Sequence, residues 1–289
     1  MVKVASCQYA ISLFDSWEAY AAHLEALAAE AAHAGAQLLL LPEYAAMTLT
    51  GLLPGDERGD LAGSIAGIQP LLPRWLALSQ DIARRHGVYF CPGSAPVLDA
   101  DGRYRNRAFL FGPQGPEGHQ DKLIMTRFER EQWIIAGGVE GLRTFDTPFG
   151  RLGILICYDN EFPMLARRLA ERGTDLVLAP SCTDTEAGHH RVRIGAQARA
   201  LENQFAVLVS PTAGAAPWSP AVDENVGRAA LYVPPDYGMP ADGVVAESGA
   251  VFTDSSRWLI ADIDLARVKA LRHEGQVALF RDWPEQFGQ

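Results

Sequence analysis

Cys157 is the residue of this 289-residue chain whose position most strongly suggests chemistry. It follows the apolar run 152–156, which predicts a buried strand, and it precedes a turn and a helix that we expect to start at Pro163. The unpaired N–H groups and the dipole at a helix N-terminus favour a thiolate and can stabilise an oxyanion. Because a free cysteine is most often a small buried hydrophobe, this position alone does not identify a nucleophile.

A glutamate follows a second predicted core strand. Residues 38–41 are four leucines, and Pro42 ends the run because a proline cannot continue the hydrogen-bond ladder of a sheet. Glu43 comes directly afterwards. A carboxylate in this position is usually a solvated loop residue or a helix cap, but a buried one would have a raised pKa and could act as a general base.

The third candidate is a lysine in a segment rich in charged residues. Lys122 follows Asp121 and precedes two glutamates, Glu129 and Glu131. A single lysine is usually a solvated surface charge. Beside a thiol and a carboxylate, however, an ammonium group would lower the thiol pKa and could donate hydrogen bonds to an oxyanion.

Taken together, these segments resemble the nitrilase superfamily, whose members are carbon–nitrogen hydrolases. Each motif is short, but their order and spacing along nearly the whole chain are specific. The resemblance is carried by residues 2–8 (VKVASCQ), Leu41-Pro42-Glu43, the segment around Lys122, residues 149–153 (FGRLG) leading into Cys157-Tyr158-Asp159, residues 175–180 (DLVLAP) and residues 199–203 (RALEN).

The resemblance implies that Glu43, Lys122 and Cys157 form the Glu-Lys-Cys triad of this superfamily. It also implies that Glu129, seven residues after the lysine, is the second active-site glutamate. Glu131 is the rival for this role, and the spacing favours Glu129.

The roles that the resemblance implies divide the cleavage of a C–N bond into two steps. Glu43 would take the proton of Cys157 and deliver it to the departing nitrogen, while the thiolate attacks the carbonyl and forms a thioester. Lys122 and the backbone N–H of Tyr158 would stabilise the oxyanion, and a water activated by Glu43 would release the acid. Glu129 would orient Lys122 or share a proton with the substrate. Such a mechanism requires no metal or organic cofactor.

The residues after the nucleophile bear on the substrate. Tyr158-Asp159 is similar to amidase-type members, whereas members that act on nitriles usually carry Trp-Glu, so we expect an amide rather than a nitrile. Glu161 could select an amine-bearing substrate, or it could only cap the next helix. Ser181, at the tip of another predicted strand, is a further candidate for contact with the substrate or the oxyanion.

Loops usually determine pocket specificity, and the candidate loops are 44–58, 181–191 and 211–227. Trp218, between two prolines in the last of these, could line a substrate entrance or pack at a dimer contact. Arg191 and Arg193 could meet a substrate carboxylate, although solvated helix charges are the simpler interpretation.

Other catalytic constellations fit the sequence less well. A cysteine–histidine pair would need a positioned histidine, and His189 and His190 stand at the expected start of a helix, where side chains are usually solvated or capping. No Cys/His cluster has the spacing of zinc ligands. Cys182, after a second strand tip, is expected to be a pocket-wall residue rather than another nucleophile.

Composition and charge restrict the class of protein. The net charge of −10 argues against a nucleic-acid partner, because phosphate binding needs a basic surface. No apolar run approaches the length of a membrane span, so no membrane partner is expected. Residues 1–14 alternate as in a strand rather than a signal peptide, which predicts a cytoplasmic protein. In that compartment the four scattered cysteines are expected to be free thiols.

The elements that must position these residues alternate between strand-like and helix-like runs. We expect strands at 2–10, 37–41, 88–97, 104–112, 142–149, 151–156, 176–179, 205–210, 229–233, 243–247 and 258–264. We expect helices at 16–34, 71–86, 163–171, 189–203 and 265–273, and turns in the glycine-rich stretch 112–118.

Two stretches repeat one helix–Gly–strand–Pro pattern: residues 35–43 (GAQLLLLPE) and residues 173–181 (GTDLVLAPS). Such α/β units often look alike, but pseudo-symmetric halves that each supply one sheet would bring the tips after Pro42 and Pro180 together. The resemblance implies the same arrangement, a four-layer α-β-β-α sandwich that forms one α/β domain over residues 1–289. It also implies a homodimer or a higher homo-oligomer that pairs through helices.

The sequence thus predicts a cytoplasmic, cofactor-independent thiol hydrolase that acts on a small linear amide. An N-carbamoyl hydrolase and a nitrilase are alternatives within the same fold. A non-catalytic ligand-binding or scaffold protein and a soluble acyltransferase are alternatives of another class. The intact active-site positions argue against a non-catalytic protein.

Overall fold

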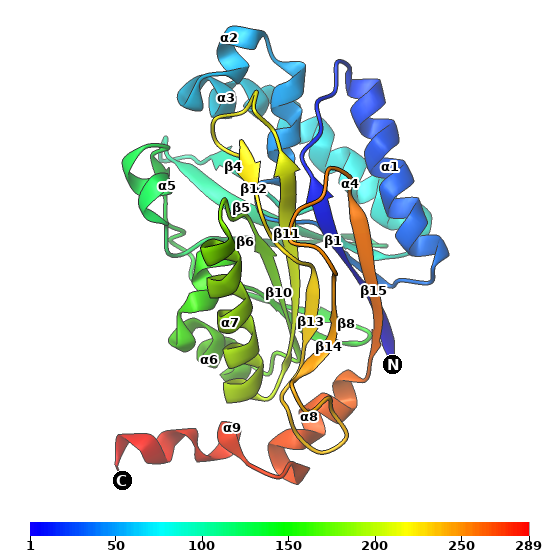
Figure 1. The fold of residues 1–289 in the computed structure, drawn as a ribbon, viewed down its shortest axis with the longest axis vertical. Helices are drawn as coiled ribbons and strands as arrows, with labels where there is room; N and C mark the ends of the chain where they lie inside the picture. Colours follow the sequence, from blue (N-terminus) through cyan, green and yellow to red (C-terminus); the bar gives the residue numbers. More distant parts are fainter. Residues whose placement is uncertain (289) are drawn as a thin grey trace.

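A computed structural model describes residues 1–288 and builds them around two β-sheets joined along one seam (Figure 1). The first sheet has the order β4 (Ser94–Leu98), β5 (Tyr104–Gly112), β3 (Tyr89–Cys91), β2 (Leu38–Leu40), β1 (Val2–Ala10) and β15 (Arg257–Ile263). The second has the order β8 (Thr144–Thr147), β9 (Gly150–Ile154), β10 (Leu176–Ser181), β11 (Ala206–Ala215), β13 (Ala230–Tyr232) and β14 (Val244–Glu247). The seam is the parallel pairing of β1 with β11 at Tyr9–Thr212 and Ala10–Ala213.

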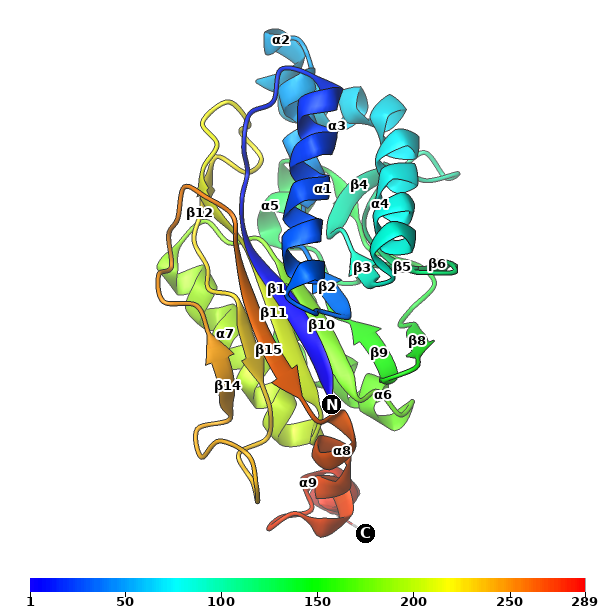
Figure 2. The ribbon, with the colours of Figure 1, turned by 90° about the vertical axis from the view of Figure 1, so that its right-hand side faces the viewer.

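Helices cover the outer face of each sheet. The helices α1 (Trp17–His33) and α4 (Leu72–His86) lie against the first sheet, and α6 (Pro163–Glu171) and α7 (Glu186–Asn203) lie against the second, on the opposite side of the molecule (Figures 1 and 2). Side chains of β1 alternate accordingly. Val2 and Val4 join the core that contains the leucines of the second sheet, whereas Cys7 and Tyr9 pack in the core beneath α1 and α4. This order of layers confirms the expected four-layer α-β-β-α sandwich.

The remaining elements complete the described chain. They are β6 (Gly115–Asp121), β7 (Ile135–Ala136), β12 (Glu224–Asn225), α2 (Gly55–Arg58), α3 (Leu61–Ile68), α5 (Arg127–Glu131), α8 (Leu265–Glu274), α9 (Leu279–Asp282) and the 3₁₀ helices η1 (Ala45–Leu52), η2 (Gln69–Leu71), η3 (Cys157–Glu161) and η4 (Trp283–Phe287). Within residues 1–288, every helix is too short or too polar to span a bilayer.

Local signals explain where the long helices begin and end. Ser16 caps α1 by accepting the N–H of Ala19, and α4 ends at Gly87, whose φ of 66° is left-handed. The helix α6 begins at Pro163, as predicted. The helix α7 begins at Glu186, before the predicted start at residue 189, because Thr185 caps it by accepting a backbone N–H.

Two stretches differ from their predictions in ways that matter for the site. Residues 88–97, predicted as one strand, form β3 and β4 with a break at Gly93. A Cβ on Gly93, whose φ is 83°, would lie 2.0 Å from the carbonyl oxygen of Pro42, so the glycine allows close approach to the segment that carries Glu43. Most of residues 112–118, predicted as turns, belong to β6, which pairs antiparallel with β5 and leads the chain to Lys122.

Candidate active site

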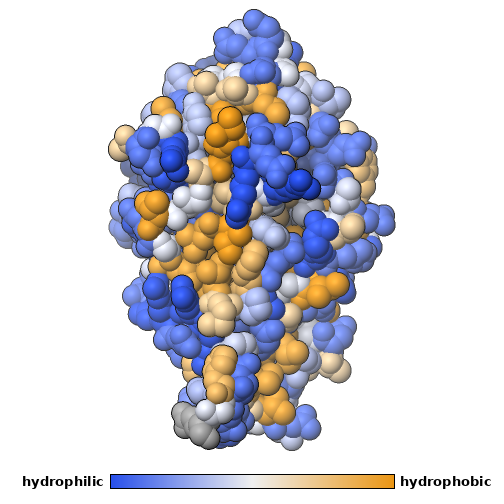
Figure 3. Space-filling model, turned by 90° about the vertical axis from the view of Figure 1, so that its left-hand side faces the viewer, coloured by the Kyte–Doolittle hydropathy of each residue, from blue (hydrophilic) through white to orange (hydrophobic). Residues whose placement is uncertain are grey.

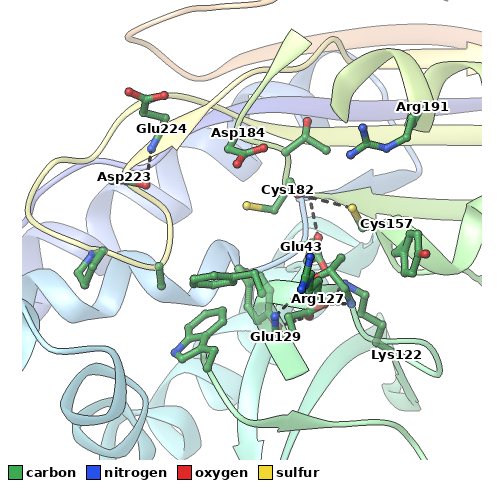
Figure 4. A pocket seen from close by; sticks show the side chains of 18 of the residues that line it. Glu43, Lys122, Arg127, Glu129, Cys157, Cys182, Asp184, Arg191, Asp223 and Glu224 are labelled. Carbon is green, nitrogen blue, oxygen red and sulfur yellow. Dashed lines mark hydrogen bonds and ion pairs between the residues drawn. The ribbon is translucent and has the colours of Figure 1, made fainter. Parts of the chain in front are cut away.

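Glu43, Lys122, Glu129 and Cys157 meet at one end of the two sheets, although they come from four separate segments (Figure 4). Glu43 follows β2, Lys122 follows β6, Glu129 lies in α5 and Cys157 begins η3 after β9. Lys122 Nζ lies 2.7 Å from Glu43 Oε1 and 2.6 Å from Glu129 Oε2. All four residues are buried, with exposed fractions between 1% and 4%. The fold therefore gathers two carboxylates, one ammonium and one thiol away from bulk water.

Cys157 adopts a backbone conformation that is uncommon for a residue with a side chain. Its φ is 46°, in the left-handed region, where the chain leaves β9 and enters η3. Such strain persists only where the surrounding structure enforces it, and it is concentrated at functional sites. The turn presents the thiol to a cavity, and Sγ lies 3.5 Å from the carbonyl oxygen of Cys182.

Three donors from distant parts of the chain hold the Glu43 carboxylate. Oε1 accepts from Lys122 and, at 2.8 Å, from Asn106 Nδ2. Oε2 accepts the backbone N–H of Cys182 at 2.9 Å. Because Cys182 directly follows the second helix–Gly–strand–Pro unit, this bond joins the tips of the two units, as their similarity predicted.

Glu129 is held by the start of its own helix as well as by the site. Thr126 and Glu129 form a capping box, in which Thr126 Oγ1 accepts the N–H of Glu129 at 3.3 Å and Glu129 Oε2 accepts the N–H of Thr126 at 2.8 Å. Thr126 Oγ1 also lies 2.8 Å from the same carboxylate oxygen. Tyr44 donates to Oε1 at 2.5 Å, and Asn106 donates to the same oxygen at 3.2 Å. Glu131 instead forms an exposed ion pair with Arg127. The geometry thus places Glu129, and not Glu131, beside the lysine.

Burial and neighbouring charges set the protonation of the cluster. Burial raises the pKa of the Cys157 thiol well above its usual value, Glu43 raises it further, and Lys122 lowers it. Burial also raises the pKa of Glu43, against the opposing effect of Lys122. Burial by itself would lower the pKa of Lys122, but the two glutamates hold it well above its usual value. The resting site therefore has a protonated thiol, a charged ammonium and a carboxylate that is a stronger base than a solvated one.

A cavity of about 540 Å³ opens at this cluster. Its lining consists of Glu43, Tyr44, Lys122, Thr126, Arg127, Phe128, Glu129, Trp133, Cys157, Tyr158, Glu161, Cys182, Thr183, Asp184, Arg191, Pro220, Ala221, Asp223 and Glu224. Tyr44, Phe128 and Trp133 form an aromatic wall, with ring centroids of Tyr44 and Trp133 4.6 Å apart. Figure 4 shows Asp184, Asp223 and Glu224 on the side away from Lys122.

The predicted site residues occupy different positions relative to this cavity. Tyr158 and Glu161 line it, and Arg191 Nε lies 3.6 Å from the half-buried Glu161 carboxylate. Ser181 is not part of the lining: its side chain is buried and donates to the carbonyl oxygen of Ala179 at 3.1 Å. The next residue, Cys182, lines the cavity instead, because successive side chains at the end of a strand point to opposite faces.

Three other sequence candidates lie outside the lining. Trp218 packs against the core beneath α1 and α4, and the loop that carries it lines the cavity with Pro220, Ala221, Asp223 and Glu224 instead. Arg193 forms an ion pair with Glu247 at 2.7 Å. His189 is buried, and burial lowers its pKa, but it does not reach the thiol's cavity.

Asn106 and Tyr44 are functional candidates that motif reasoning missed. Asn106 is fully buried and donates to both active-site glutamates, and Tyr44 donates to Glu129. The available signal for Asn106 was an amide within a predicted strand, where a buried polar side chain needs a partner. In the described part of the chain, no group of three or more His, Cys, Asp or Glu side chains is arranged to hold a metal ion.

Comparisons with known proteins identify the family of this chain. Residues 3–273 match the model of the carbon-nitrogen hydrolase family. The chain is 32% identical over 281 residues to the probable hydrolase YhcX of Bacillus subtilis (strain 168), covering 97% of this chain and 53% of that protein, so it spans about half of that relative's length. It is 31% identical over 258 residues to the omega-amidase NIT2-B of Xenopus laevis, covering 85% of this chain and 83% of that protein.

The fold is also similar to a solved structure. A crystal structure of a carbon-nitrogen hydrolase from Helicobacter pylori G27 superimposes with a TM-score of 0.73 at 19% identity, covering 100% of this chain and 94% of that one. The matched region of the family model contains all four residues of the buried cluster. The chain therefore belongs to the carbon–nitrogen hydrolase family, within the nitrilase superfamily.

Proposed function

We propose that this protein hydrolyses the C–N bond of a small linear amide through a thioester on Cys157. The observation that carries the proposal is the buried cluster at the base of the cavity, where a strained cysteine, a lysine and a glutamate of raised pKa lie together. Family membership supports a hydrolase of this kind.

In the first step, Glu43 accepts the proton of Cys157 as the sulfur attacks the amide carbonyl carbon. A C–S bond forms, and the carbonyl oxygen becomes an oxyanion that Lys122 and the backbone N–H of Tyr158 stabilise. Glu43 then donates the proton to the nitrogen, the C–N bond breaks, and ammonia or an amine leaves. Glu129 keeps Lys122 oriented through their 2.6 Å ion pair.

In the second step, a water molecule attacks the thioester carbon while Glu43 takes a proton from that water. The C–S bond breaks, the carboxylic acid is released, and Cys157 regains its proton. The same carboxylate thus serves as base and acid in turn, which suits a group whose pKa burial raises toward the working pH.

The cavity favours a compact substrate without a negative charge. Its volume of about 540 Å³ lies in the range of small-molecule sites. Of its two arginines, Arg127 pairs with Glu131 and Arg191 pairs with Glu161. Asp184, Asp223 and Glu224 form no ion pair within the described residues, so the mouth carries net negative potential.

The test is ammonia release from a panel of small amides, N-carbamoyl amino acids and nitriles. We expect the wild type to turn over amides and Cys157→Ala to turn over none. The matched control is Cys182→Ser, which removes the second thiol of the cavity but keeps Cys157, and we expect it to turn over amides. Turnover that persists in Cys157→Ala would refute the thioester mechanism. Preferred release from carbamoyl compounds or nitriles would identify those substrates instead.

The same assay separates the alternatives of another class. With hydroxylamine added, an acyltransferase forms the hydroxamate in preference to the free acid, because the amine replaces water at the thioester. A non-catalytic protein releases nothing, and its Cys157 reacts with iodoacetamide no faster than the buried Cys7 or Cys91.

We also propose that the protein is cytoplasmic and that a second copy covers the outer face of α6 and α7. Met164, Ile194 and Leu201 on these helices are exposed at 51%, 63% and 39%. Figure 3, viewed from this side, shows apolar residues gathered in the middle of the face with hydrophilic residues around them. The molar masses of the wild type and of Ile194→Glu, measured by light scattering, test the pairing of two copies. A monomeric wild type contradicts it.

A further inference from the structure

Asp159 is a buried carboxylate close to the nucleophile, and the mechanism above leaves it without a role. Its exposed fraction is 1%. Oδ2 accepts the backbone N–H of Leu123 at 3.0 Å, and Oδ1 accepts that of Ile124 at 2.8 Å. Oδ1 also accepts the N–H of Leu123 at 3.2 Å, and within residues 1–288 the carboxylate has no other hydrogen-bond partner. Burying a carboxylate without a bonded cation is costly, so the arrangement it stabilises must be specific.

The two donors belong to the segment between Lys122 and Glu129. After β6 ends at Asp121, residues 123–126 form no helix or strand until α5 begins. The N–H of Lys122 donates to the carbonyl oxygen of Asn106 at 2.8 Å, and its own carbonyl accepts from Gly138 at 2.8 Å. Asp159 supplies the acceptors for the next two N–H groups. The lysine segment is therefore tied directly to η3, the turn that begins at the nucleophile.

A purely local role does not account for these contacts. Asp159 is the third residue of η3, and none of its three side-chain hydrogen bonds goes to that turn, so it is not a cap of η3. Its bonds instead cross to residues 35 and 36 positions away in the sequence. Both ends of this link carry a member of the reacting cluster.

We propose that Asp159 is a positioning residue that holds the Lys122 segment against the Cys157 turn. It fixes the distance between the ammonium and the thiol, and so the place where the oxyanion forms. The proposal rests on the thiol mechanism proposed above. An asparagine at 159 offers one acceptor oxygen and an NH₂ group that cannot accept, so it removes at least one of the three hydrogen bonds of the link while nearly keeping the volume.

The experiment compares Asp159→Asn with Asp175→Asn. Asp175 is also a buried carboxylate that accepts a backbone N–H, from Arg151 at 2.9 Å, but it precedes β10 at the end of the strand away from the site. For Asp159→Asn we expect kcat to fall on the order of 10²-fold with KM changed by less than about threefold, as for a displacement of about 1 Å. For Asp175→Asn we expect a lower melting temperature and an unchanged kcat.

A second readout does not depend on the substrate. Lys122 lowers the pKa of Cys157, so moving the ammonium away raises this pKa. The rise in the rate of Cys157 alkylation by iodoacetamide then occurs at higher pH. We expect this shift in Asp159→Asn and not in Asp175→Asn. If the wild type hydrolyses nothing on the panel, the proposed function fails while the alkylation profiles still test Asp159.

Unchanged kcat and an unchanged alkylation profile in a folded Asp159→Asn protein overturn the proposal. Equal losses in both variants also overturn it, because they indicate general destabilisation. Should Asp159→Asn not fold, Asp159→Glu, which keeps both oxygens but displaces them by one methylene, is measured against the same control with the same expectations.

Discussion

Removing the positive charge from the buried cluster tests its electrostatics most directly. Lys122→Met keeps most of the length of the side chain but leaves Glu43 and Glu129 without the ammonium that lies 2.7 Å and 2.6 Å from them. All three side chains are at most 3% exposed, so water cannot replace the lost charge. The donors that remain are Asn106, Tyr44, Thr126 and the N–H of Cys182.

Breaking a buried ion pair by removing one partner costs about 3–5 kcal/mol. At about 2 °C per kcal/mol for a chain of this size, Lys122→Met should melt about 6–10 °C below the wild type at pH 8. The carboxylates left without a cation have raised pKa values in the folded variant. The penalty is therefore fully present above those values and is lost as the pH falls through them, so the difference in melting temperature should shrink from pH 8 to pH 5.

Thermal unfolding followed by circular dichroism at both pH values measures this. The control is Lys269→Met, which removes the partner of Asp175 at 3.1 Å, but from a side chain that is 55% exposed. Because the lysine end of this pair is solvated, we expect the pair to contribute at most about 1 kcal/mol. A Lys122→Met protein that melts within about 2 °C of the wild type at pH 8 would refute the idea that two ionised carboxylates share one buried ammonium.

Further predictions concern turnover. Asn106→Ala removes the donor shared by both glutamates and should lower kcat roughly 10²-fold with little change in KM, and an unchanged kcat would show that Glu43 is oriented without it. Because Glu43 must be ionised to accept the thiol proton and burial raises its pKa, kcat/KM should fall as the pH drops through this raised pKa; a profile that stays flat into the range where a solvated glutamate is protonated contradicts this. Asp184→Asn with Glu224→Gln should raise kcat/KM for an anionic amide relative to its neutral analogue several-fold at low salt, and equal effects on both substrates would exclude electrostatic selection.

The elements and the chemical groups were predictable from sequence because their signals are local. Four leucines before Pro42 predict a buried strand, and Pro163 and Gly87 mark a helix start and a helix end. The break at Gly93 was missed because its reason is the approach of Pro42, which lies in another strand's loop. The helix α7 starts earlier than predicted because Thr185 caps it, and this signal is present in the sequence.

The sequence alone was enough to predict the fold family and the candidate thiol, lysine and glutamates, and pseudo-symmetric halves were one of two explanations that it offered for the repeated strand tips. How these groups are held follows from the tertiary structure. Asn106 lies 63 positions from Glu43, Tyr44 lies 85 from Glu129, and Cys182 lies 139 from Glu43. It also decided that Cys182 rather than Ser181 faces the cavity. Hydrogen bonds and burial depend on distances between segments that are far apart along the chain, and a single sequence carries no direct signal of those distances.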